Sequence, residues 1–298
     1  MPQLSAVLPL KVEPHKTNSY EVARNLFRSL VKFGGTGVFE TFYIVCHGGH
    51  EALLLDEFDE FRENLSIKII DEDALVPELS DYPDISGWRK QQILKLAISK
   101  LMNTPYFITF DADAICTHPI SEQILLPEGK GLLHPVKDNT RKIWWTSSAA
   151  ELGIRTPQVD GMNVTPAILS TDVCKGLIRE LDSKKNWVHR LMKPHRKWSW
   201  KRLLLPWFKS TYHWTEYTLY YLFMYKHGLI DQYHITAGTA SIPQTLVSAN
   251  SVWKRTNFEN WDPSLPFSNS DPALFCIIQS NKNIPPDVVW KKISDYIQ

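Results

Sequence analysis

The first 115 residues alternate short apolar runs with longer segments that have helical character. The apolar runs lie at residues 5–10, 41–46, 67–70 and 106–110, and each is the length of one strand. Helices are expected between them, at residues 18–34, 51–61 and 88–101. Because strands that alternate with helices form βαβ units, this pattern predicts an α/β fold with a mainly parallel central sheet flanked by helices.

Residues 116–298 follow a less regular pattern. Strands are expected at residues 131–134, 164–169, 234–236 and 275–279, and a helix at 215–226. We find no internal repeat, low-complexity segment or linker in the sequence. A single domain over residues 1–298 is therefore expected, with an irregular C-terminal half.

Composition and charge exclude several classes of protein. Hydrophobic residues make up 43% and charged residues 22%, as in ordinary soluble proteins, and the net charge of +1 favours no acidic partner. The four cysteines form no C-x-x-C pair, so we expect buried thiols in a reducing compartment and no zinc cluster. No run of about 18 apolar residues exists, and residues 1–10 lack a basic leader, so a cytoplasmic location is expected.

Two acids, Asp111 and Asp113, follow directly on the apolar run 106–110. Ligands bind at the carboxyl ends of strands in α/β sheets, and carboxylate oxygens suit Mg²⁺ and Mn²⁺. A metal held there would neutralise a diphosphate leaving group. The same pair is also compatible with a loop acid that caps a turn, because D-x-D is a common pattern.

Residues 106–113 resemble the D-x-D motif of GT-A glycosyltransferases. Residues 87–95, with the sequence GWRKQQILK, resemble the helix that flanks the nucleotide in a poorly characterised bacterial branch of that fold. The resemblance covers residues 4–135 in layout. It implies a GT-A-like fold, Mn²⁺ or Mg²⁺, a nucleoside-diphosphate sugar donor (a UDP-sugar is expected) and transfer to a glycan or glycolipid hydroxyl. Residues 1–115 would then be the nucleotide-sugar-binding half and residues 116–298 the acceptor-binding half.

The resemblance also implies roles for individual residues of the donor half. Asp113 would be the main metal ligand, and Asp111 would contact the ribose or the metal. Arg89, Lys90 and Gln91 would be donor contacts, although a solvated helix face explains them equally well.

In the second half, Glu216 lies at the start of an expected helix, where the helix dipole keeps a carboxylate ionised. By resemblance it is the candidate general base of an inverting transfer, although first-turn acids are common and a retaining enzyme needs no such base. His234 is the candidate third metal ligand. His118, His134 and His213 stay open as alternatives for that ligand. Asp160 or Asn163 would contact the acceptor or the donor, although a turn before a strand needs no function, and residues 279–281 would close over the donor.

A basic, tryptophan-rich stretch runs from Lys184 to His213, with nine lysines and arginines, four tryptophans and no acid. This composition is typical of contact with an anionic membrane surface, here the inner face of the membrane, and would suit a lipid-linked acceptor in polysaccharide biosynthesis. A solvated face with a buried tryptophan side fits as well. Single-stranded nucleic acid is a weaker alternative and is not expected as a partner.

Three other functions were weighed against glycosyl transfer. Haloacid-dehalogenase phosphatases use a D-x-D motif, but on the first strand and with Thr or Val where Ile115 stands. Nucleotidyltransferases carry a glycine-rich loop after the first strand, whereas residues 11–16 contain no glycine. A membrane- or nucleic-acid-binding module based on the basic stretch would leave the acid pair without a role.

Overall fold

The computed structural model describes residues 3–12, 19–136, 142–183, 185–195, 213–279 and 284–298. Its central sheet has five strands in the order β3-β2-β1-β4-β7, of which the first four are parallel and β7 is antiparallel to β4. The remaining strands form two small sheets, β5-β10-β9 and β6-β8. The strands are β1 Leu4–Pro9, β2 Phe42–Cys46, β3 Ile67–Asp71, β4 Tyr106–Thr109, β5 Ala114–Cys116, β6 Gly131–Leu133, β7 Ala167–Ser170, β8 His234–Thr236, β9 Thr245–Val247 and β10 Ala273–Ile277.

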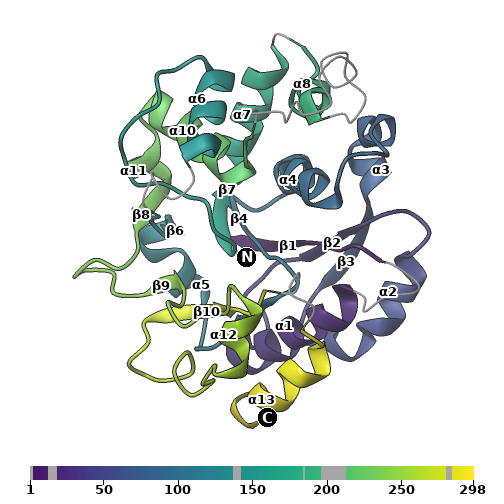
Figure 1. The fold of residues 1–298 in the computed structure, drawn as a ribbon, viewed down its shortest axis with the longest axis vertical. Helices are drawn as coiled ribbons and strands as arrows, with labels where there is room; N and C mark the ends of the chain where they lie inside the picture. The colour runs from purple at the N-terminus through teal and green to yellow at the C-terminus, as the bar shows by residue number, and fades with distance from the viewer. Residues whose placement is uncertain (1–2, 13–18, 137–141, 184, 196–212, 280–283) are drawn as a thin grey trace.

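Helices cover both faces of the central sheet (Figure 1). One face packs on α1 and α2, and the other packs on α4, α7 and α10. The helices are α1 Ser19–Gly34, α2 Glu51–Glu57, α3 Glu72–Leu75, α4 Gly87–Ala97, α5 Glu122–Leu125, α6 Lys142–Leu152, α7 Thr171–Asp182, α8 Trp187–Met192, α10 Glu216–His227, α11 Ile230–Tyr233, α12 Arg255–Glu259 and α13 Pro286–Ile297.

The alternation of side chains along β4 explains how one strand serves two cores. Tyr106 and Ile108 belong to the apolar cluster on the α1 side, whereas Phe107 belongs to the cluster on the α4 side. Thr109 has the same parity as Phe107 and therefore faces α4 and α10. Every residue of β1, β2 and β4 is buried, as expected for strands covered by helices on both faces.

The predicted α/β fold with a mainly parallel sheet is confirmed, and the differences lie mostly in the second half. The helices α6, α7 and α13 were not predicted. The acidic segment Asp71–Asp73 ends β3 and begins α3, with the Asp71 carboxylate accepting a hydrogen bond from the Asp73 amide at 3.0 Å. Short polar residues cap helices in this way, so the acidic composition was consistent with a helix start.

Candidate active site

The site centres on Lys95, a cation in the buried part of α4. Residues 92–97 of this helix are all buried, and only 4% of the Lys95 side chain is exposed. Its ammonium nitrogen lies 2.8 Å from an oxygen of Asp111 and 3.2 Å from an oxygen of Glu216. Asp111 follows β4 and Glu216 opens α10, so one lysine joins an acid of the first half to an acid of the second.

A tyrosine completes the coordination of the lysine. The Tyr217 hydroxyl accepts a hydrogen bond from Lys95 at 3.2 Å, and it lies 2.7 Å from the Thr109 hydroxyl and 2.9 Å from the Thr165 hydroxyl. The Lys95 ammonium donates hydrogen bonds to Asp111, Tyr217 and, at 3.5 Å, the Thr165 hydroxyl, and it forms an ion pair with Glu216. Its three N–H donors therefore all have acceptors. Buried polar groups paired this completely hold each other in one arrangement.

The start of α10 fixes the position of Glu216. Thr215 is the N-cap, and its hydroxyl accepts a hydrogen bond from the Thr218 amide at 3.2 Å. The Thr218 hydroxyl in turn accepts one from the Thr215 amide at 3.1 Å, which closes a capping box. The capping box makes α10 begin at Glu216. The Glu216 carboxylate then lies against Lys95 of α4.

The charges of this group are strongly coupled. Burial raises the pKa of Glu216, and the nearby Asp111 carboxylate raises it further, while Lys95 acts in the opposite direction. Burial alone would lower the pKa of Lys95, but its acidic neighbours outweigh burial and hold that pKa well above the ordinary value. Lys95 is therefore charged at neutral pH, and it compensates both carboxylates.

Asp111 and Asp113 lie in different surroundings. The Asp111 side chain is 43% exposed, and one of its oxygens is held by Lys95. Asp113 borders a small, mostly apolar pocket with Asn25 and Ile278, and its backbone oxygen accepts a hydrogen bond from the Ile278 amide at 3.0 Å. The acid pair thus lies where β4, α1 and the end of β10 meet.

The oxygen ligands at this edge fit a hard divalent cation. Asp111 is accessible and needs only one oxygen for Lys95, and Asp113 follows two residues later at the same strand end. Mg²⁺ and Mn²⁺ prefer carboxylate oxygens and share them with substrate phosphates. The two acids could therefore hold the metal that the resemblance implies.

The three predicted donor contacts on α4 differ in their exposure. Arg89 is buried, and its guanidinium donates to the Trp214 carbonyl at 3.2 Å and pairs with a His213 ring nitrogen at 2.8 Å. Arg89 thereby anchors the segment that leads into α10. Lys90 and Gln91 are partly exposed on the same helix and stay predictions as donor contacts.

The prediction that His234 ligates the metal is corrected. His234 opens β8 and is 3% exposed. One ring nitrogen lies 2.7 Å from the Tyr220 hydroxyl, and the other lies 3.0 Å from the Gly131 carbonyl oxygen. With both nitrogens hydrogen-bonded inside the protein, His234 connects β8 to α10 and β6 and has no nitrogen to offer a metal.

This buried histidine should make the protein sensitive to acid. Burial lowers the pKa of His234 from 6.5 to about 4. As the pH falls, the histidine is protonated first in the unfolded chain. The contribution of the neutral, buried His234 to stability is therefore complete above pH 6.5 and is lost as the pH falls towards 4. Between pH 7 and pH 5 the loss should be about 2 kcal/mol in the free energy of unfolding. Urea denaturation of the wild type and of His234→Gln at both pH values checks this prediction. Between pH 7 and pH 5 the free energy of unfolding should fall less in the variant than in the wild type, by that amount, and equal falls would contradict the prediction.

The other expected contacts are less central. His118 also has both ring nitrogens in hydrogen bonds, to the Thr117 hydroxyl at 3.2 Å and the Ser268 carbonyl at 3.0 Å. Asp160 is exposed and Asn163 half-buried, and both stay predictions as contacts. Most of the basic tryptophan-rich stretch, residues 196–212, and residues 280–281 lie outside the described residues. Within the described part of the chain, no helix has the length and apolar character needed to cross a bilayer.

Sequence reasoning missed the residue that holds the site together. The sequence pattern gives no separate role to Lys95 within residues 87–95, nor to Tyr217, Thr109 and Thr165. One signal was present: Lys95 stands among Ile93, Leu94, Leu96 and Ala97, in a helix with apolar residues all around it. A lysine in such surroundings is buried only when it is paired, so it indicates acidic partners elsewhere in the chain.

The mainly parallel central sheet flanked by helices, with the antiparallel β7 beside β4, is a GT-A-like fold. In agreement, the structure of mouse xyloside xylosyltransferase 1 aligns with 94% of this chain and 99% of its own, with a TM-score of 0.52 and 12% sequence identity. At 12% identity this likeness shows the fold alone. The galactosyltransferase LgtC also aligns, with 98% of this chain and 95% of its own, at a TM-score of 0.49 and 10% identity.

In sequence, the chain belongs to the DUF6492 family, a family of unknown function, whose model matches residues 1–298. No curated protein matches the chain.

Proposed function

We propose that the protein is a metal-dependent glycosyltransferase that moves a sugar from a nucleoside-diphosphate donor, expected to be a UDP-sugar, to a glycan or glycolipid hydroxyl. The observation that carries this proposal is the junction at Lys95. Lys95 pairs with Asp111, from residues 1–115 that we assign to the donor, and with Glu216, from residues 116–298 that we assign to the acceptor. Glycosyl transfer needs a donor site and an acceptor site to meet in this way.

In this proposal metal binding, orientation and proton transfer belong to different residues of the chain. Asp113 and Asp111 hold Mn²⁺ or Mg²⁺, which when bound neutralises the charge of the diphosphate leaving group. Lys95 holds one oxygen of Asp111 at 2.8 Å and so fixes the orientation of that carboxylate. Glu216 takes the proton from the acceptor hydroxyl in an inverting reaction, and its raised pKa gives it more basicity than an ordinary carboxylate.

The acceptor side of the proposal rests on composition. The basic stretch 184–213 would bring the protein to the inner, cytoplasmic face of a membrane and so to a lipid-linked acceptor. The haloacid-dehalogenase alternative is not pursued, because the acid pair follows β4 and not the first strand.

Binding of the donor nucleotide should depend on both metal and Asp113. We expect one of UDP, GDP, CDP and dTDP to raise the melting temperature of the wild type in the presence of Mn²⁺ but not without it. A ligand at one hundred times its dissociation constant stabilises the native state by about 2.7 kcal/mol. The same nucleotide with Mn²⁺ should not stabilise Asp113→Asn.

The matched control is Asp262→Asn, which changes an exposed acid in the loop after α12 and should keep the full shift. If no nucleotide stabilises the wild type, or if Asp113→Asn responds as the wild type does, the acid pair is not a donor site and the proposal fails.

A further inference from the structure

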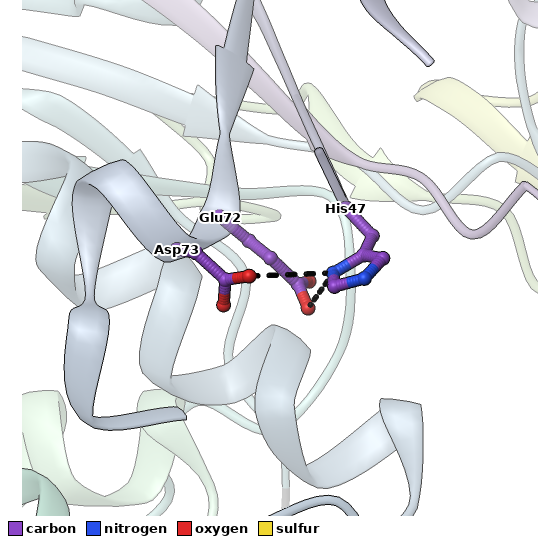
Figure 2. A group of neighbouring side chains, drawn as sticks. All are labelled: His47, Glu72 and Asp73. Atoms are coloured by element: carbon purple, nitrogen blue, oxygen red, sulfur yellow. Dashed lines mark ion pairs between the residues drawn. The ribbon is translucent and has the colours of Figure 1, made fainter. Parts of the chain in front are cut away.

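A second group of potential metal ligands lies at the same edge of the sheet, two strands away from β4. His47 follows β2, and Glu72 and Asp73 follow β3. Figure 2 shows the two carboxylates turned towards the ring of His47. The Nδ1 atom of His47 lies 3.3 Å from a Glu72 oxygen and 3.7 Å from an Asp73 oxygen.

The pairing of the strands explains why these residues meet. Cys46 of β2 is the register partner of Asp71 of β3, so the next residues, His47 and Glu72, leave the sheet side by side. Gly48 then passes so close to Asp71 that an added Cβ would lie 3.0 Å from its carboxylate. Only glycine fits this approach without a shift, and the tight passage fixes the direction in which His47 leaves the strand.

The distances suit one small divalent cation. Zn²⁺ binds histidine nitrogen and carboxylate oxygen at about 2.0–2.2 Å in a tetrahedron, so neighbouring ligand atoms should be about 3.3–3.5 Å apart. The two distances from His47 Nδ1 are close to this value, and the three ligand atoms all lie within 4.8 Å of one another. A mixed nitrogen and oxygen set of this kind favours a transition metal over Mg²⁺ or Ca²⁺.

The neighbouring cysteine belongs to the core and not to this group. Cys46 is fully buried and lies in the apolar cluster on the α1 side of the sheet. The Asp71 carboxylate accepts a hydrogen bond from the Asp73 amide, and this bond holds Asp73 in place.

We propose that His47, Glu72 and Asp73 form a zinc-class metal site, separate from the acid pair after β4. With three protein ligands the fourth position is left to water. The ion would fasten the loop after β2 to the start of α3, and so stiffen the carboxyl edge of the sheet beside the donor site. This proposal does not depend on the proposed transferase function.

The test is a titration of the metal-free full chain with Zn²⁺, by calorimetry and by the visible absorption of Co²⁺ as a tetrahedral probe. The wild type should bind one Zn²⁺ at this site. His47→Ala and Asp73→Asn should each weaken that binding at least tenfold and remove the Co²⁺ absorption. His47 is 66% exposed, so its replacement should leave the fold intact.

Two controls separate this site from others. His50→Ala changes a histidine three residues along the same segment and should bind Zn²⁺ as the wild type does. Asp113→Asn should also keep this Zn²⁺, while His47→Ala should keep the nucleotide and Mn²⁺ response of the wild type. The proposal is overturned if the wild type binds no Zn²⁺, if His47→Ala binds it unchanged, or if His47→Ala loses the nucleotide response.

Discussion

Replacing Lys95 with methionine is expected to lower the free energy of unfolding by about 3–5 kcal/mol, because the change leaves two acids beside each other without their cation. Lys95 is 4% exposed and contacts both Asp111 and Glu216. Lys95 lowers the pKa of Glu216 against the effect of burial, so in the variant this pKa should rise further, and the loss should be larger at pH 8 than at pH 5. Urea denaturation at the two pH values measures both effects.

The second step of this experiment removes one of the acids. Lys95→Met combined with Glu216→Gln should recover part of the lost stability, because a neutral amide no longer repels Asp111. The matched control is Lys226→Met, which breaks a pair with Glu180 in which the lysine side chain is 31% exposed and should cost less than about 1 kcal/mol. Equal losses in the Lys95 and Lys226 variants, or no recovery in the double variant, would contradict the role given to Lys95.

Replacing Glu216 with glutamine is expected to lower kcat by a factor of about 10²–10⁴, the usual contribution of a general base. The shape of the side chain is kept, and Lys95 retains Asp111 as a partner, so the fold and the response to nucleotide and Mn²⁺ should persist. In the wild type, activity should rise as the pH passes the raised pKa of Glu216, and this acidic limb should be absent from the residual activity of the variant.

The burial of Glu216 makes this test decisive. Its side chain is 5% exposed and pairs with Lys95, so the base role requires that an acceptor hydroxyl reach a buried carboxylate. If the variant loses its nucleotide response together with its activity, Glu216 is a positioning residue for Lys95 and not the base. Glu180→Gln on α7 is the control, because Glu180 also pairs with a lysine but lies in another part of the molecule, and it should keep full activity.

Local pattern was sufficient to predict the first half of the fold. The strands β1, β2 and β4 are continuous apolar runs because both faces of the sheet are covered, and the strand boundaries agree to within one residue or two. The antiparallel direction of β7 and the pairing of β5 with β10 were not predicted. Cys116 pairs with Phe275, far along the chain, and nothing near either residue encodes that contact.

The same reason limited the prediction of the site. Asp111, Asp113 and Glu216 carry local signals, a strand end and a helix start. Lys95 gains its role from Tyr217, 122 positions away, and His234 loses its predicted role through hydrogen bonds to Tyr220 and Gly131. A side chain's chemistry is local in the sequence, but its availability is decided by tertiary contacts.

The position of β7 has a consequence for engineering. The strand comes from the second half of the chain, yet it forms the edge of the first half's sheet, with Ile108 of β4 opposite its Ile168. Cutting at residue 115 would expose the whole edge of β4 to other molecules, and unprotected edges promote aggregation. A chimaera that exchanges the second half of the chain should therefore join its parents after Ser170, and it must still supply an acid at position 216 to meet the lysine of α4.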